Sequence, residues 1–224
     1  MNGRYLAIDL GTVNYAAVVN NVGEEPFLLS SRDIESEIGS KQCELNTLNW
    51  KLDKFKKNGN KESYNKTLEE VEEVKSEIND LRYRRDNFEY LATAYIVRFC
   101  VDNQIETIIC GRYLEENRNL EFKHIQFFRM LGEIAERNNI ELIEVDEQYT
   151  SGTSFLDNEE PVKGNYNKRR RVIRDFFKSK SGTYINADVN AAYQIMRKYD
   201  TYCFEGHDMR WFIVPRVVDF NELS

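Results

Sequence analysis

The chain has 224 residues, which is room for one domain of ordinary size or for one domain carrying a large insertion. Hydrophobic residues make up 41% and charged residues 31%, and Pro occurs three times, so the composition indicates a folded soluble chain and excludes a disordered one. The formal net charge of −7 counts against a protein that binds nucleic acid with its whole surface, but it does not exclude a local basic groove.

No apolar stretch approaches the ~18 residues of a membrane span, so we expect no membrane partner and a cytoplasmic location. The four cysteines are widely scattered, with two histidines to help them, and this spacing indicates neither a structural zinc site nor a disulfide framework.

The first 30 residues predict a meander of three strands: Tyr5–Leu10, Tyr15–Asn20 and Pro26–Ser30. Asp9 lies near the end of the first strand, and Gly11 follows where the chain turns. A charge in a half-buried position is costly unless a cation or a donor offsets it. Asp9 is therefore a candidate for a metal or phosphate site, and the alternative is that it only caps the turn.

From Asp33 onward, apolar residues recur at steps of three, four and seven, which predicts a helix. The run Lys57-Asn58-Gly59-Asn60 breaks this pattern, and a second helical stripe extends from Tyr64 to Phe99. We expect two long antiparallel helices that form a hairpin insertion at about residues 33–87.

Four further segments follow in chain order: a strand at Thr107–Cys110, a helix at Phe122–Asn138, a strand at Ile140–Asp146 and a helix at Asp188–Tyr199. Residues 151–183 are predicted to be irregular, and 211–214 read as a possible last strand. A strand, a helix and a strand in succession imply a right-handed parallel crossover.

This order of elements predicts an α/β chain with an RNase H-like fold: a mixed sheet with helices on both faces and a long helical-hairpin insertion. Asp188 opens the last helix, where the helix dipole tolerates a carboxylate. Enzymes that cut phosphodiester bonds with two divalent ions about 4 Å apart need several carboxylates in one place, because Mg²⁺ prefers hard oxygen ligands. Asp9 and Asp188 would be two of these acids.

Four segments in order resemble the RuvC-like nuclease part of TnpB, the RNA-guided nuclease of insertion sequences and a relative of type V CRISPR effectors. They are Ala7–Asn14, Glu144–Ser151, Ser154–Asn158 and Asn186–Ala192. The resemblance covers about residues 4–198 and implies that residues 1–224 form a single RuvC-like nuclease domain. It also implies that Asp9 and Asp188 are the first and last metal-binding acids, with two Mg²⁺ or Mn²⁺ ions as cofactors.

The middle acid departs from the usual pattern. Most of the family has a Glu at the end of the strand before the Phe122 helix, and here the matching stretch has Cys110, whose thiol cannot replace a carboxylate for Mg²⁺. The segment Glu147-Gln148-Tyr149-Thr150-Ser151 resembles a branch in which this Glu is relocated, which implies Glu147 as the third acid. Glu144 and Asp146 are alternatives, although strand alternation makes them face away from Glu147.

The same branch lacks a zinc ribbon between the last two motifs, so we expect no zinc. The loop at about 151–183 is basic instead, and its cations could bind backbone phosphates beside the metal site. The alternative is a merely solvated loop. The candidate nucleic-acid-binding residues are Lys163, Lys168, Arg169, Arg170, Arg171, Arg174, Lys178 and Lys180.

Relatives in this family carry an additional N-terminal region that holds guide RNA and recognises a target motif, whereas this chain starts at the first nuclease strand. We therefore expect DNA and guide RNA as partners, with a separate protein or region supplying RNA and target-motif binding. The predicted function is a metal-dependent DNA endonuclease. One alternative is a nuclease-dead RNA-guided DNA-binding protein. A further alternative is an actin-like or heat-shock-type ATPase, which would need a duplicated domain and a second phosphate loop.

Overall fold

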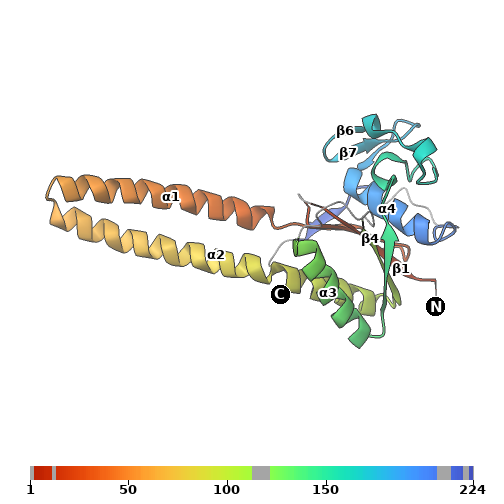
Figure 1. Cartoon of the computed structure of the whole chain (residues 1–224), viewed down its shortest axis with the longest axis horizontal. Coiled ribbons are helices and arrows are strands. Elements are labelled where there is room, and N and C mark those ends of the chain that lie inside the picture. The colour runs from red at the N-terminus through yellow and green to blue at the C-terminus, as the bar shows by residue number, and fades with distance from the viewer. Residues whose placement is uncertain (1–2, 12–13, 113–121, 206–212, 219–221, 224) are drawn as a thin grey trace. The chain divides into compact units, whose positions relative to one another are not determined.

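The computed structural model describes residues 3–11, 14–112, 122–205, 213–218 and 222–223 (Figure 1). The chain divides into two compact units, one formed by Met1–Ser30 with Tyr90–Ser224 and the other by Ser31–Glu89. Among the described helices, none is long and apolar enough to cross a membrane.

The larger unit contains a six-stranded sheet in the order β5-β4-β1-β2-β3-β9. Its strands are β1 (Tyr5–Leu10), β2 (Ala16–Asn20), β3 (Phe27–Leu29), β4 (Thr107–Arg112), β5 (Glu141–Asp146) and β9 (Arg216–Val218). The meander β1-β2-β3 is antiparallel, while β4 pairs with β1, β5 with β4, and β9 with β3 in parallel. This mixed sheet has the strand order of the predicted RNase H-like fold, which is confirmed.

Strand alternation gives the sheet two apolar faces. Ala7 and Ile109 lie in the core beneath helix α4 (Ala187–Tyr199). On the other face, the ring of Phe27 contacts the rings of Tyr95 and Phe99 in the C-terminal part of helix α2 (Lys61–Asp102), and helix α3 (Phe122–Arg137) packs near β5. Helices therefore cover both faces.

Polar side chains fasten α4 to the segment that follows β5. The buried amide of Asn190 donates to the carbonyl of Thr153 at 2.8 Å and accepts from the backbone N–H of Phe155 at 3.0 Å. One turn later, Gln194 donates to Thr153 Oγ1 at 3.1 Å and to the Glu159 carbonyl at 2.9 Å. Because these buried groups satisfy one another, the segment and α4 hold a single register.

The smaller unit is formed by α1 (Arg32–Lys57) and the first part of α2, and these two predicted helices are confirmed. They run antiparallel in Figure 1, and their contact is a small apolar cluster of Leu48, Val71, Val74 and Ile78. An ion pair of 2.6 Å joins Lys41 to Glu77 across the two helices. In α2, Glu69, Glu72 and Glu73 are exposed and Glu70 is half-buried.

The prediction that residues 151–183 are irregular is wrong in part. The segment contains the short 3₁₀ turns η1 (Thr150–Gly152), η2 (Lys163–Asn165) and η3 (Lys168–Arg170), and a second sheet in the order β6-β7-β8 follows them. Its strands, Arg171–Ile173, Phe176–Lys178 and Tyr184–Asn186, have three residues each, and a register shift interrupts the first pair. Strands this short carry too little alternation to be recognised from sequence.

The predicted last strand at 211–214 lies partly outside the described residues, and residues 213 and 214 are not in a strand. The last strand begins later, at Arg216.

Candidate active site

Asp9 lies near the end of β1 and, by alternation with Ala7, faces α4. Burial raises the pKa of Asp9 well above its ordinary value, and the carboxylates of Glu147 and Asp188 raise it further, while Arg171 lowers it. The carboxyl group of Asp9 therefore lies within electrostatic reach of the other two predicted acids, Glu147 and Asp188, which are far from it in the sequence.

Asp188 is the second residue of α4, and the side chain of Asn186 caps this helix by accepting from the backbone N–H groups of Asp188 and Val189. Both carboxylate oxygens of Asp188 have a partner. Asn14 donates to one oxygen at 2.9 Å, and Arg171 donates to the other at 2.8 Å. The last acid of the site is thus held between an amide from the β1–β2 turn and a guanidinium from β6.

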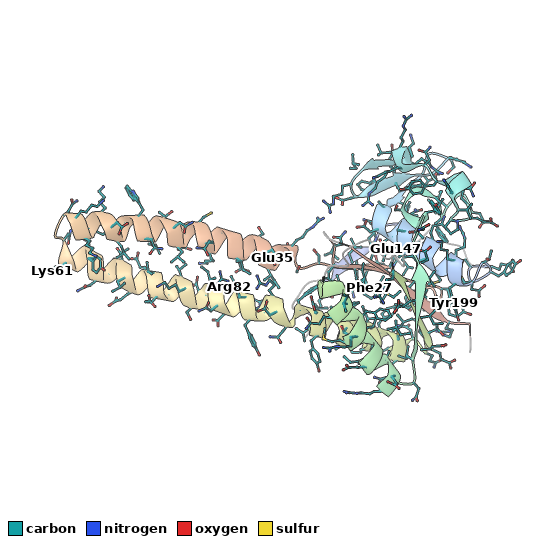
Figure 2. The ribbon with its side chains drawn as sticks, viewed as in Figure 1. Phe27, Glu35, Lys61, Arg82, Glu147 and Tyr199 are labelled. Carbon is teal, nitrogen blue, oxygen red and sulfur yellow. The ribbon has the colours of Figure 1, made fainter. Side chains whose placement is uncertain are left out.

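Glu147 follows the last residue of β5 and is labelled in Figure 2. Its backbone N–H donates to the carbonyl of Arg112 at 3.1 Å, and its own carbonyl accepts from the hydroxyl of Thr150 at 2.8 Å. A Cβ added to Gly111 would lie 3.3 Å from Glu147 Oε2 and 2.3 Å from Ile195 Cδ1. Ile195 therefore occupies the space that a side chain at position 111 would need, and the carboxylate of Glu147 lies at the margin of that space.

The interpretation of Cys110 as the residue in place of the family's Glu stays a prediction, but the pairing of β4 shows which face of the sheet its thiol is on. Cys110 pairs with Ile8 in the parallel ladder, so its side chain faces away from Asp9. Gly111 is the β4 residue on the Asp9 face. Burial raises the pKa of the Cys110 thiol far above its ordinary range, and the nearby carboxylates of Glu147 and Asp9 raise it further, so the thiol stays protonated.

The two alternative acids lie elsewhere. Both carboxylate oxygens of Glu144 accept from Arg112 at 2.8 Å, and this guanidinium lies over the ring of Phe128 in α3, on the face opposite to Asp9. Asp146 accepts from the backbone N–H of Gln148 at 3.2 Å. The orientation of Glu144 agrees with the prediction from strand alternation.

A cavity of about 220 Å³ opens beside the acids. Its lining residues are Asp9, Glu147, Tyr149, Thr150, Ser151 and Tyr166. Two carboxylates, two hydroxyl-bearing turn residues and two aromatic rings thus surround one small space.

The donor set suits a hard divalent cation, because all three acids offer oxygen and half-buried carboxylates beside one another need positive charge. Within the described residues, no group of three or more His, Cys, Asp or Glu side chains is arranged to hold a metal ion. The guanidinium of Arg171 supplies positive charge next to Asp9 and Asp188 instead. A cation that binds the same oxygen of Asp188 would compete with Arg171.

The eight basic candidates separate into two groups. Arg170 forms ion pairs with Asp157 and Glu159 and lies over the ring of Phe177, while Lys180 pairs with Glu159 at 2.7 Å and Arg171 with Asp188. These three cations have partners within the protein. The other five are exposed: Lys163, Lys168, Arg169, Arg174 and Lys178, the last lying over the ring of Tyr184.

Sequence reasoning missed two residues of the site and gave a third a different role. Asn14 stood in the first quoted motif without a function, and Gly111 was noted only as part of the β4 stretch. Arg171 was predicted to contact phosphates, but it holds Asp188. The only sign of Asn14 in the sequence was its position as a polar residue just after the turn. The structure shows that its amide is buried and therefore requires partners.

Residues 124–195 match the family model described as Cas12f1-like, TNB domain. This match covers about a third of the chain, and it supports the predicted resemblance to the TnpB-like, RNA-guided nucleases. No curated protein is significantly similar in sequence.

Two solved structures are similar to this chain. One is described as the cryo-EM structure of a Cas12f1-sgRNA-target DNA complex, with a TM-score of 0.51, 18% identity, and coverage of 87% of this chain and 50% of that chain. The other is a CRISPR-Cas12f ternary complex, with a TM-score of 0.53, 18% identity, and coverage of 85% and 38%. At this identity the likeness shows the fold, and the chain spans half or less of each relative.

Proposed function

We propose that the chain is the metal-dependent endonuclease part of a TnpB-like, RNA-guided DNA nuclease, with Asp9, Glu147 and Asp188 as its metal-binding acids. The observation that carries this proposal is the convergence of the three carboxylates on one face of the sheet. Each comes from a separate segment, and the other two raise the pKa of Asp9. Three acids gathered without a structural need indicate a site built for cations.

When bound, a pair of divalent cations would activate a water molecule and neutralise charge on the scissile phosphate and on the leaving oxygen. The residues of the chain prepare this site. Asn14 fixes one oxygen of Asp188, and the backbone contacts of Glu147 aim its carboxylate over Gly111. Arg171, which pairs with Asp188 at 2.8 Å, would offer positive charge to a DNA phosphate beside the acids.

DNA and guide RNA are the proposed partners. One of the similar structures is described as a complex with sgRNA and target DNA, and this chain covers 50% of the protein chain in it. We propose that another protein or region provides RNA and target-motif binding. The exposed cations Lys163, Lys168, Arg169, Arg174 and Lys178 would contact phosphates without reading sequence.

The competing function is that of a nuclease-dead, RNA-guided DNA-binding protein. The observation that favours it is the ion pair between Arg171 and Asp188, because the guanidinium holds an oxygen that a cation would need. Cys110 no longer supports this alternative, since its side chain faces away from Asp9.

The test is cleavage of single-stranded or displaced DNA in the presence of Mg²⁺ or Mn²⁺. We expect Asp9→Ala, Glu147→Ala and Asp188→Ala each to reduce the cleavage rate at least about 100-fold, because each removes a group that holds charge in the transition state. The matched control is Glu144→Ala, which removes an acid from the opposite face and should cut within about 3-fold of the parent.

Two outcomes would contradict the proposal. If Glu147→Ala cuts as fast as the parent, the third acid is wrong. If the parent cuts nothing when guide RNA and a protein that supplies the missing region are added, the nuclease-dead function is favoured.

A further inference from the structure

Two residues that line the cavity beside the acids have no role in the proposed chemistry. Besides Asp9 and Glu147, the rings of Tyr149 and Tyr166 line this cavity. The two ring centroids are 5.7 Å apart with an interplanar angle of 70°, which is an edge-to-face pair. Cleavage of a phosphodiester by carboxylate-bound cations requires no aromatic group, so these rings need another explanation.

Tyr149 is held in a backbone conformation that non-glycine residues rarely adopt. Its φ is 68° and its ψ is 0°, in the left-handed region. The hydroxyl of Thr153 donates to the Tyr149 carbonyl at 2.8 Å, and this contact keeps the turn closed. Backbone strain of this kind persists where the surroundings impose it, often at ligand-binding sites. Here it fixes an aromatic side chain two residues after Glu147.

Tyr166 is positioned by Gly152. A Cβ added to Gly152 would lie 2.4 Å from the Tyr166 ring, so the ring rests directly on the glycine backbone. The backbone N–H of Asn167 donates to the Gly152 carbonyl at 2.8 Å, which ties the two segments together. Tyr166 remains 37% exposed, so the ring is anchored but available to a ligand.

The size of the cavity limits what it can hold. Its volume of about 220 Å³ exceeds the roughly 150 Å³ that accommodates one benzene ring but is below the ~300 Å³ at which sites for drug-sized ligands begin. One flat ring system fits, and a stacked base pair does not. The hydroxyls of Thr150 and Ser151 provide polar groups between the rings and the acids.

We propose that this pocket holds one unpaired nucleobase of the strand whose phosphodiester is presented to Asp9 and Glu147, with the base packed against Tyr166 and Tyr149. This inference rests on the proposed nuclease function and names its substrate as single-stranded DNA. A base in the pocket must be unpaired and unstacked, as it is in a single strand, whereas a duplex would first have to flip the base out. Packing on an aromatic face accepts any base, because every base has one.

The experiment measures binding of a short oligothymidylate and of an abasic DNA backbone of the same length to the full chain, by fluorescence anisotropy with Ca²⁺ in place of Mg²⁺. We expect Tyr166→Leu to weaken binding of the oligothymidylate on the order of 10-fold and to change binding of the abasic backbone less than about 2-fold. Tyr166→Phe should bind like the parent. The control Tyr202→Leu removes an aromatic side chain that is 70% exposed outside the pocket, and it should change neither affinity.

Equal losses of affinity for the two ligands in Tyr166→Leu would contradict the proposal, because they would make Tyr166 a structural residue. Undetectable binding of the oligothymidylate to the parent would also contradict it. Tyr149→Asn provides a second variant if Tyr166→Leu fails to fold, since Asn tolerates a positive φ, and it should show the same base-dependent loss. Base-dependent binding without cleavage would remove only the nuclease function. If Tyr166→Leu binds the oligothymidylate as the parent does and Asp9→Ala abolishes cleavage, the base-binding pocket is contradicted and the nuclease function is not.

Discussion

Gly111 leaves room for two side chains beside the site. It lies on β4 on the same face as Asp9. A Cβ at this position would lie 2.3 Å from Ile195 Cδ1 and 3.3 Å from Glu147 Oε2, so Ile195 occupies the space and Glu147 lies at its margin. A side chain at position 111 would therefore displace Ile195 and press on the carboxylate of Glu147.

We expect Gly111→Ala to lower the DNA cleavage rate about 10-fold and the free energy of unfolding by about 1–3 kcal/mol. The new methyl group would meet Ile195 Cδ1 at 2.3 Å and would press on Glu147 Oε2 at 3.3 Å, so both side chains must move. Cleavage kinetics and urea denaturation measure the two effects. The matched control is Gly132→Ala in α3, whose Cβ meets Leu142 at an ordinary 3.5 Å; an equal loss of activity there would contradict the explanation.

The resemblance selected Asp9, Glu147 and Asp188, and the structure places Glu147 and Asp188 near enough to Asp9 to raise its pKa. The metal-binding role of these acids, the cofactors and the absence of zinc stay predictions. The facing of Cys110 could not be read from the sequence, because a shift of one residue exchanges the two faces of a strand. The contact between Arg171 and Asp188 joins β6 to α4, and no pattern in the sequence predicts a pairing across such a distance.

At the scale of elements, Arg170 lies directly before the small sheet β6-β7-β8 and joins this part of the larger unit to the segment that contains Asp157 and Glu159. Its guanidinium contacts Asp157 and Glu159, and the three side chains are 13%, 12% and 7% exposed. Burial raises the pKa of each acid, but hydrogen bonds and cations outweigh this effect, so both pKa values lie below their ordinary range. The contributing donors include the backbone N–H of Lys180 for Asp157 and the side chain of Lys180 for Glu159.

Because both carboxyl groups have lowered pKa values in the folded state, their contribution to stability is fully present above the unfolded values of about 3.9 and 4.3 and is lost as the pH falls through the lower folded values. We therefore expect the urea-unfolding free energy to fall more steeply below about pH 4 in the parent than in an Asp157→Asn, Glu159→Gln double variant. Parallel curves for the two proteins would contradict this.

At neutral pH, we expect Arg170→Met to lower the free energy of unfolding by about 3 kcal/mol. The exposed control Arg169→Met should lower it by less than about 0.5 kcal/mol.

The strands and helices that carry regular hydrophobic periodicity were predictable, and the short ones were not. β1, α1 and α3 begin and end within a few residues of their predicted limits. The strands β6 to β8 escaped detection because an ion-paired cluster and the two buried residues Phe177 and Ile185, rather than a repeating pattern, stabilise them.

At the scale of the whole molecule, the helical hairpin is a compact unit with its own apolar cluster. Near its open end, Arg85 lies 3.9 Å from Glu35 on the other helix, so the two helices can be joined there by a short turn. That residues 1–224 act as one nuclease domain stays a prediction.

We expect a variant in which residues 37–84 are replaced by a short Gly-rich turn to unfold in a single transition with a melting temperature within about 5 °C of the parent, because the core of the larger unit contains no residue from the deleted segment. Circular dichroism measures the transition, and it should show loss of helix signal only. Aggregation of the trimmed chain, or loss of its strand signal, would contradict this independence.

The order of the six-stranded sheet has a consequence for solubility. Within the described part of the chain, β5 pairs only with β4, so its outer backbone groups form an open edge. Open edges invite strand addition between molecules, and charged side chains are a common defence. Three of the six residues of β5 are acidic, Glu141, Glu144 and Asp146, so two copies that approached edge to edge would align like charges at neutral pH. The sheet that carries the candidate site can thus end in water without acting as a template for aggregation.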